Sequence, residues 1–298
     1  MIDLYYTIAD LFRGTYTGLF IRTFFEYAVQ IGPYFIIAVF LNVFLKIYIS
    51  RKNIQFRNPH TLWSIPAASI IGIVSPLPTY LALPMGLSLH GCGLPLGAVV
   101  AFMIASPLLN PGIFVLTFTQ LGWEIAVARL ISVLVISLSG GFLAQALLKH
   151  FQFLRHQDES SFKVTSRPFR VELKRSLLFM GKYMLIALLL SSFVRAFVPD
   201  EMIGRLFGGG RASTNLLAAL VMGVPFYSCG GAAIPLVQVL SEMGMHKGAV
   251  LTFLLSGPTT KLETLIVYKS LTGLKFMLLY LVFNLVSSVL CGALLFLF

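Results

Sequence analysis

Four short stretches that interrupt apolar sequence carry the side chains of this chain that could bind a solute. In the second half, residues 227–231 (YSCGG) place the thiol of Cys229 beside two glycines. Free backbone amides at such a break can activate a thiol as a nucleophile or a metal ligand. The alternative is that Cys229 packs as a small hydrophobic residue.

Residues 256–261 (SGPTTK) end in Lys261, and Glu263 follows shortly after. A charge at membrane depth is costly and typically marks a transport pathway or a paired site. The alternatives are that both charges lie at the membrane interface or that they satisfy each other.

The first half offers the stretches 75–80 (SPLPTY) and 106–111 (SPLLNP). Asn110, with Thr259 and Thr260 of the second half, supplies neutral hydrogen-bonding groups that suit a polar solute, although such residues also bridge helices without a ligand. The predicted substrate-binding residues are Pro76, Pro78, Tyr80, Asn110, Tyr227, Cys229, Gly230, Gly231, Thr259, Thr260, Lys261 and Glu263.

The elements that must position these residues are apolar enough to lie in a membrane. The chain has 298 residues, of which 57% are hydrophobic and 11% charged, and its mean hydropathy is +0.88. A soluble domain of this size needs more polar surface. Because a spanning helix takes about 20 apolar residues, we predict spanning helices within 24–49, 121–148, 177–198 and 274–298, and Pro- or Gly-broken segments within 62–89, 93–121, 215–240 and 248–268.

Composition and spacing exclude several kinds of site. The net charge of +11 comes without an aromatic–basic stripe, so we predict no nucleic-acid partner. The three cysteines have unrelated spacings and the five histidines are scattered, which argues against a disulfide framework and against a metal site. No enzyme motif is present, so we predict neither catalytic residues nor a cofactor. Arg129, inside an apolar stretch, is expected to extend its side chain to the membrane interface.

The sequence contains an internal repeat. An offset of 151 residues aligns seven glycine or proline pairs without a gap, whereas roughly one or two would match by chance. The pairs are Gly72/Gly223, Pro84/Pro235, Gly93/Gly244, Gly97/Gly248, Pro107/Pro258, Gly122/Gly273 and Gly141/Gly292. Each half therefore contains a helix, two broken segments and a further helix.

Duplicated breaks indicate the binding site of a secondary transporter near the membrane midplane. Irregular backbone survives in hydrocarbon only where protein or a water-filled cavity surrounds it. Proline removes a donor and glycine permits conformations that a helix excludes, which frees peptide groups for a ligand. The alternative is that proline and glycine merely kink the helices.

Lysine and arginine cluster at residues 51–57 and, most densely, at 149–175. If both clusters are cytoplasmic, each half crosses the membrane an odd number of times, the halves are inverted, and one broken segment per half is re-entrant. The alternative is a parallel repeat with four full crossings per half. The predicted fold is an all-α polytopic membrane protein, with an amphipathic lead-in (1–23), two membrane repeats (24–148 and 176–298) and a basic cytoplasmic linker (149–175).

These motifs resemble the ArsP/YraQ-type predicted permeases. The resemblance rests on the Leu83-Pro84 and Ile234-Pro235 elements, on the paired glycine motifs that follow them, and on the breaks after Pro107 and Pro258. Members named ArsP export trivalent organoarsenicals, which bind soft thiolates. Where the family often has paired cysteines, this chain has Pro78, Tyr80 and a single Cys229. The resemblance therefore implies the fold and the transporter class but not an arsenical substrate.

We predict a secondary transporter, multi-pass in the bacterial plasma membrane, that moves a small polar, anionic or thiol-reactive solute or ion, with efflux as one option. Its partners are the bilayer and, in addition, a second copy of the chain or a cytoplasmic protein at the basic linker. The alternative function is a membrane scaffold or enzyme subunit whose partner binds residues 149–175.

Overall fold

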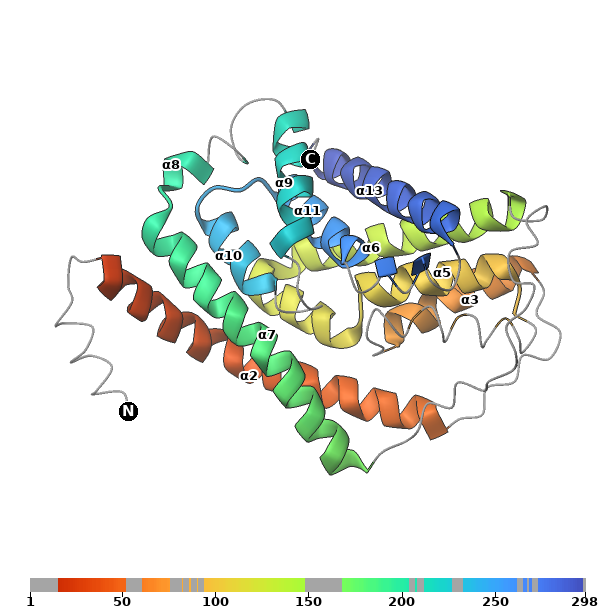
Figure 1. Ribbon diagram of the computed structural model, residues 1–298, viewed down its shortest axis with the longest axis horizontal. Helices are drawn as coiled ribbons and strands as arrows, with labels where there is room; N and C mark the ends of the chain where they lie inside the picture. The colour runs from red at the N-terminus through yellow and green to blue at the C-terminus, as the bar shows by residue number, and fades with distance from the viewer. Residues whose placement is uncertain are drawn as a thin grey trace.

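The computed structural model describes residues 16–51, 61–75, 82, 86, 90, 94–147, 168–203, 207, 212–226, 233–261, 265–266, 268–269 and 273–296. Within these residues the regular secondary structure is helical (Figure 1). The helices are α2 (Tyr16–Arg51), α3 (Thr61–Val74), α5 (Leu96–Leu108), α6 (Pro111–Leu147), α7 (Phe169–Phe197), α8 (Asp200–Ile203), α9 (Ala212–Phe226), α10 (Ile234–Glu242), α11 (Lys247–Thr260) and α13 (Leu274–Phe296). The all-α class predicted from the sequence is confirmed.

Two of these helices are long and apolar enough to cross a membrane by length and composition, namely Pro111–Ala146 within α6 and Leu274–Phe296, which is α13. Several others are too short to cross alone. At 1.5 Å per residue, α3, α5 and α11 each extend only about 20 Å, against a hydrocarbon core of about 30 Å.

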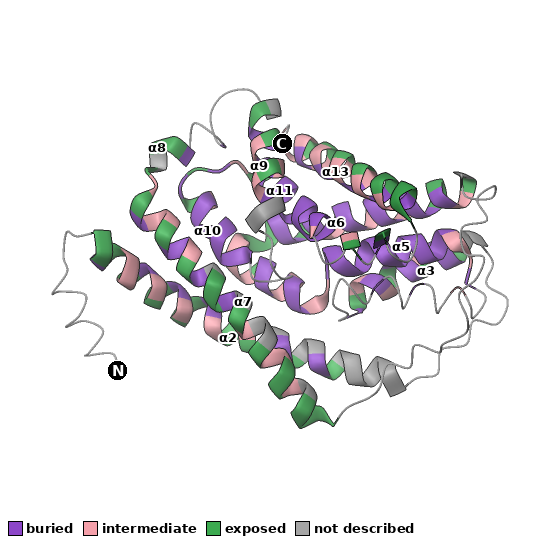
Figure 2. Cartoon of the chain, viewed as in Figure 1, coloured by how far each residue is buried: buried purple, intermediate pink, exposed green. Residues whose placement is uncertain are grey.

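The long helices α2 and α7 pack against each other in opposite directions on one side of the molecule (Figure 1). Tyr16 at the start of α2 stacks on Phe197 at the end of α7, with ring centroids 5.8 Å apart. Phe40, further along α2, lies 6.2 Å from Phe169 at the start of α7. Both helices expose many large apolar side chains, as lipid-facing helices do (Figure 2).

The core is built on α5 and α11, which are buried along almost their whole length (Figure 2). A helix that is apolar on every side has no face that prefers water, so it is covered by neighbours all round. Helices α3 and α6 cover α5, whereas α9 and α13 cover α11.

Helix α6 bends sharply at Gly122, whose φ of +87° is a conformation that side chains with a Cβ rarely adopt. Gly273, directly before α13, has a φ of +84°. After the bend, α6 runs about 32 Å from Glu124 to Gln145, which matches the thickness of a bilayer core.

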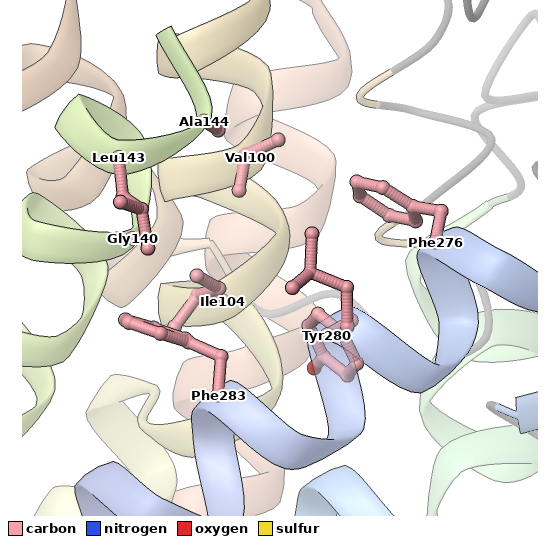
Figure 3. A pocket seen from close by; sticks show the side chains of 9 residues that line it. Val100, Ile104, Gly140, Leu143, Ala144, Phe276, Tyr280 and Phe283 are labelled. Atoms are coloured by element: carbon pink, nitrogen blue, oxygen red, sulfur yellow. The ribbon is translucent and has the colours of Figure 1, made fainter. Parts of the chain in front are cut away.

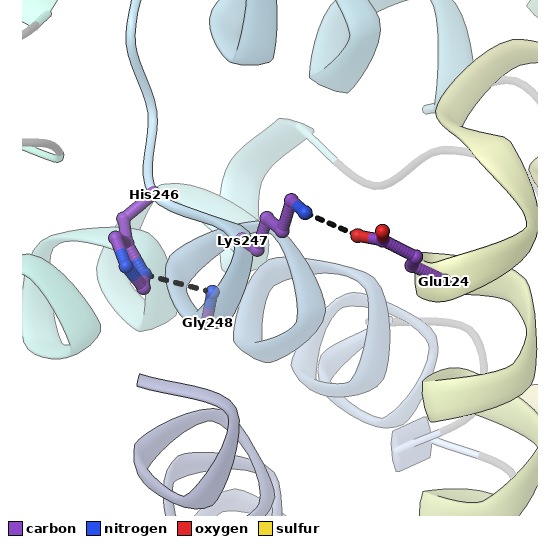
Figure 4. Close-up of polar contacts among 4 residues, drawn as sticks. All are labelled: Glu124, His246, Lys247 and Gly248. Atoms are coloured by element: carbon purple, nitrogen blue, oxygen red, sulfur yellow. Dashed lines mark hydrogen bonds and ion pairs between the residues drawn. The ribbon is translucent and has the colours of Figure 1, made fainter. Parts of the chain in front are cut away.

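Helices α5 and α11 begin at opposite ends of this straight part of α6. The Gly97 amide at the start of α5 donates to Gln145 Oε1 at 2.9 Å. Lys247, the first residue of α11, instead forms an ion pair with Glu124 (Figure 4). Beside it, the His246 ring caps α11 by accepting a hydrogen bond from the Gly248 amide. The two helices therefore enter the core from opposite directions.

Glycine allows the helices to approach closely. A Cβ on Gly97 would lie 2.6 Å from the carbonyl oxygen of Gly141, and a Cβ on Gly248 would lie 2.5 Å from that of Gly292. Gly97 and Gly248 therefore serve close helix packing.

Candidate functional site

Each core helix contains a proline that releases one backbone carbonyl. Pro107 near the end of α5 has no N–H to donate to Met103 O, and Pro258 near the end of α11 has none for Leu254 O. Both helices end within three residues of the proline. The break predicted at 106–111 is confirmed, because α5 stops at Leu108 and α6 starts at Pro111.

The released carbonyls accept hydrogen bonds from side chains far away in sequence. Tyr268 donates its hydroxyl to Met103 O at 3.3 Å. Arg129 Nη2 donates to Leu254 O at 3.4 Å. Each broken helix thus receives a donor from the opposite half of the chain, and we call this crossed arrangement the junction.

Arg129 is the largest fully buried side chain in the described part of the chain. Its Nη1 donates to Thr117 Oγ1 at 3.0 Å, and its Nη2 also donates to Leu108 O at 3.0 Å. Leu108 O is one of the terminal carbonyls that an α-helix leaves unbonded, so Arg129 also caps α5. A cation there is favourable because the C-terminus of a helix carries partial negative charge.

The expectation that Arg129 extends to the membrane interface is wrong. Its exposed fraction is zero. The physical reason is that the core offers three oxygen acceptors, namely two carbonyls at the breaks and the hydroxyl of Thr117. The sequence pattern alone suggests only hydrocarbon around Arg129.

Four of the twelve predicted binding residues lie in the described residues, and all four lie where a core helix ends. Asn110 caps the start of α6, because its Oδ1 accepts from the Ile113 amide at 2.9 Å. Thr259 and Thr260 donate their hydroxyls to carbonyls of the last turn of α11, including Ser256 O at 2.7 and 3.2 Å. Lys261 is the half-buried C-cap residue of α11, and its carbonyl accepts from the Leu265 amide.

The other eight lie outside the described residues, so their part in a binding site stays a prediction. They are Pro76, Pro78, Tyr80, Tyr227, Cys229, Gly230, Gly231 and Glu263.

Three further residues of the core, Tyr268, Tyr280 and Ser106, were not predicted from the sequence. Tyr268 and Tyr280 are buried with ring centroids 4.4 Å apart. Ser106, in the last turn of α5, has a buried hydroxyl that meets no hydrogen-bond partner among the described residues. The internal repeat could have pointed to the tyrosines. At the offset of 151 residues, Tyr268 corresponds to Thr117 and Tyr280 corresponds to Arg129.

A pocket between α5, α6 and α13 is a separate feature. Figure 3 shows its apolar lining, with Ile104 of α5 facing Phe283 of α13 and Tyr280 at one side. Tyr280 brings the one hydroxyl among the lining side chains. Such a surface suits a lipid chain better than a polar solute.

The junction presents a guanidinium group, hydroxyls and backbone carbonyls within an apolar core. These groups can exchange hydrogen bonds with a polar or charged solute, and they offer no nucleophile–base pair. No cluster of three or more His, Cys, Asp or Glu side chains that could hold a metal ion occurs in the described ranges.

Comparison with known proteins gives the class of the molecule. The chain is 20% identical over 267 residues to a Streptococcus mutans protein named as a candidate subunit of a two-component membrane permease complex, covering 86% of this chain and 87% of that one. It is also 26% identical over 109 residues to the UPF0718 protein MJ0584 of Methanocaldococcus jannaschii. This second match covers 37% of the chain but only 30% of the archaeal protein.

No solved structure matches the chain. The sequence profile of the ArsP_1 family, described as predicted permeases, matches residues 18–296. These similarities agree with the apolar helices described above and with the family resemblance in the sequence. The chain therefore belongs to the ArsP_1 family of predicted permeases, as a membrane transport protein rather than an enzyme.

Proposed function

We propose that this permease is a secondary transporter whose solute crosses the membrane at the junction. The observation that carries the proposal is the crossed pair of hydrogen bonds, Tyr268 to Met103 O and Arg129 to Leu254 O. Helices that are broken inside an apolar core leave exchangeable polar groups there, and alternating access needs such groups near the middle of the membrane.

A duplicated architecture is part of this proposal, and contacts in the two halves support it. Gly97 approaches Gly141 and Gln145, and the residues 151 positions later, Gly248, Gly292 and Phe296, make the same approach. Gly72 lies against Phe102, Ala105 and Ser106, and its counterpart Gly223 lies against Phe253, Ser256 and Gly257. Since these are pairs with the same offset, the same helix packing recurs.

Inverted orientation of the halves is supported by two pairs of helices. The first helix of each half, α2 and α7, run antiparallel. Helices α5 and α11 also correspond, and they start at opposite ends of α6, beside Gln145 and Glu124. If the basic linker at 149–175 is cytoplasmic, the Glu124–Lys247 pair lies at the outer face.

A re-entrant segment in the first half fits the same geometry. Ile65 near the start of α3 lies at Gly141, close to the linker end of α6, while Gly72 near its end lies deeper, at Ala105. The chain is back at the linker end by Gly97, which bonds to Gln145. Helices α3 and α5 therefore both start at the linker end of α6, as a re-entrant segment requires.

We infer that the solute is small and polar or anionic. Arg129 at the junction and Lys261 at the end of α11 bring positive charge to the breaks, and Asn110, Thr259 and Thr260 add neutral hydrogen-bonding groups. The binding role predicted for the thiol of Cys229 extends the proposed substrates to thiol-reactive solutes. Export is one direction consistent with a site that both halves share.

A second subunit is a further proposal. The S. mutans relative is named as a candidate subunit of a permease complex, and the basic linker at 149–175 is the predicted docking segment. A scaffold role would require this partner, whereas a self-contained transporter would not.

The proposed location of the chain is the bacterial plasma membrane.

Reconstitution of the purified chain alone in lipid vesicles tests this function. We expect uptake of at least one member of a panel of radiolabelled small anions, thiols and metalloids, and its loss in Arg129→Met and Lys261→Met. Lys275→Met, on the exposed first turn of α13, is the matched control and should transport like wild type. Equal flux in vesicles with and without the protein, for every solute, would refute transport by the chain alone.

A further inference from the structure

An exposed carboxylate, Glu242, ends α10 and contacts a helix of the other proposed half. Tyr27 of α2 donates its hydroxyl to Glu242 Oε2 at 2.5 Å. Gln238, one turn earlier on α10, donates through Nε2 to Glu242 Oε1 at 3.1 Å. The contact joins an outer helix of the first half to the helix that follows the predicted break at 227–231.

Glu242 differs from two other carboxylates of the described chain. Glu26 is paired with Arg22, and Glu124 with Lys247, in exposed ion pairs. A neighbouring cation favours the ionised form of a carboxylate. The hydrogen-bond donors to Glu242 in the described ranges are instead a phenol and an amide, both neutral.

The elements packed around this cluster carry few charges. Arg195 of α7 and Glu26 of α2 act electrostatically on Tyr27. Across α6 and α11, Glu124 and Lys247 neutralise each other, and the ring of His246 accepts from the Gly248 amide.

The cluster can accommodate both protonation states of Glu242. Gln238 is 6% exposed, and its Oε1 has no hydrogen-bond partner among the residues the structure describes. Rotation of the amide by half a turn would present Oε1 as an acceptor for a proton on Glu242. The Tyr27 hydroxyl can likewise change from donor to acceptor. A purely structural contact would not explain why the buried Gln238 Oε1 lies next to a carboxylate without a hydrogen-bond donor among the described residues.

We propose that Glu242, with Tyr27 and Gln238, is a proton-binding site that couples protonation to movement of α2 against α10. The proton comes from the aqueous phase and adds to one carboxylate oxygen, so a single O–H bond forms and the charge changes from −1 to zero. The charge-assisted bond from Tyr27 then becomes a weaker neutral bond. Protonation therefore loosens α2 from α10, and this inference rests on the proposed transport function, in which such loosening opens the junction.

Pulsed electron paramagnetic resonance tests the inference without any solute. Spin labels are placed at Val29 of α2 and at Trp123 of α6, which packs against α10 and so reports its position relative to α2. Both sites are exposed, and the full chain is used with its three cysteines replaced by serine. In wild type we expect the distance distribution between the labels to change on acidification. Glu242→Gln should give the acid distribution at every pH, because the amide is uncharged like the protonated acid. Glu201→Gln, at an exposed carboxylate of α8, is the matched control and should respond to pH like wild type.

Infrared spectroscopy measures proton binding on the same samples. One component of the protonated-carboxyl band that appears on acidification should be missing in Glu242→Gln, and the same component should shift in Tyr27→Phe. Tyr27→Phe should also favour the acid distribution at alkaline pH. If Glu242→Gln does not fold, Tyr27→Phe decides. A Glu242→Gln protein that still responds to acid, a Tyr27→Phe protein indistinguishable from wild type, or a wild type without response would overturn the inference. The label distances and the infrared band are measured without a solute, so they test the proton site alone. Absence of flux in the vesicle experiment would instead refute the transport function.

Discussion

At the scale of single residues, the junction explains why a fully buried arginine persists in an apolar core. Arg129 donates to Thr117 Oγ1, Leu108 O and Leu254 O. A buried carbonyl left without a donor costs about 1–3 kcal/mol, so proline breaks are tolerable only with donors from elsewhere. Arginine, whose planar fork carries five N–H groups, can serve several acceptors at once.

Each side-chain donor of the junction should be energetically coupled to the proline that frees its acceptor carbonyl, so Tyr268 should be coupled to Pro107. Tyr268→Phe removes the donor to Met103 O, and Pro107→Ala restores a backbone N–H for the same carbonyl. We therefore expect Tyr268→Phe to destabilise the protein by about 1–2 kcal/mol and to cost clearly less in a Pro107→Ala background. The free energy of unfolding of the four proteins in detergent gives the coupling energy.

The matched control uses the other break. Pro258→Ala restores an N–H for Leu254 O, so it should leave the cost of Tyr268→Phe unchanged while reducing that of Arg129→Met. Equal coupling of Tyr268 to both prolines would contradict the crossed arrangement.

Among single residues, the sequence predicts features that follow from the backbone chemistry of proline and glycine, but not features that depend on packing. Proline and glycine positions located the break at 106–111 because they change the backbone itself. The burial of Arg129 was missed because two of its three acceptors are backbone carbonyls, 21 and 125 residues away in sequence, and a sequence pattern carries no sign of such partners.

At the scale of elements, close helix approach depends on matched glycines. Gly97 and Gly248 each lie where a Cβ would overlap a carbonyl oxygen of the neighbouring helix. We expect Gly97→Ala and Gly248→Ala each to destabilise the protein by about 1–3 kcal/mol, because the helices must move apart. Thermal unfolding of the purified variants measures both.

Gly32 and Gly181 are the controls, because a Cβ on either meets nothing within 4 Å. Alanine there should instead raise stability by about 0.5–1 kcal/mol, since glycine weakens a helix interior. Destabilisation by all four substitutions alike would remove the packing explanation.

Hydropathy predicted which stretches form helices, but not their lengths. The predicted lead-in at 1–23 overlaps α2, which runs without interruption from Tyr16. Helix ends at α5 and α11 follow from proline, whereas the bend in α6 follows from the φ of Gly122, which the sequence shows only as a glycine paired with Gly273.

At the scale of the whole molecule, the proposed inversion places the starts of α5 and α11 on opposite sides of the membrane. Single cysteines at Pro95 and Lys247, in a background without the native cysteines, report their sides. In intact cells we expect a membrane-impermeant thiol reagent to label Lys247→Cys, and to label Pro95→Cys only after permeabilisation. Labelling of both sites from the same side would favour a parallel repeat. Charge distribution suggested inversion from the sequence, and the contacts of Gly97 and Lys247 give the directions of α5 and α11 relative to α6.

The accessibility of Asn110→Cys and Thr260→Cys tests most directly whether the junction is a transport path. A small water-soluble thiol reagent should modify both cysteines from at least one aqueous side, and Val282→Cys, on an exposed face of α13 that would meet lipid, should stay unmodified. If neither Asn110→Cys nor Thr260→Cys reacts from either side while the protein remains folded, the broken helices form a dry structural core and the transport path lies elsewhere.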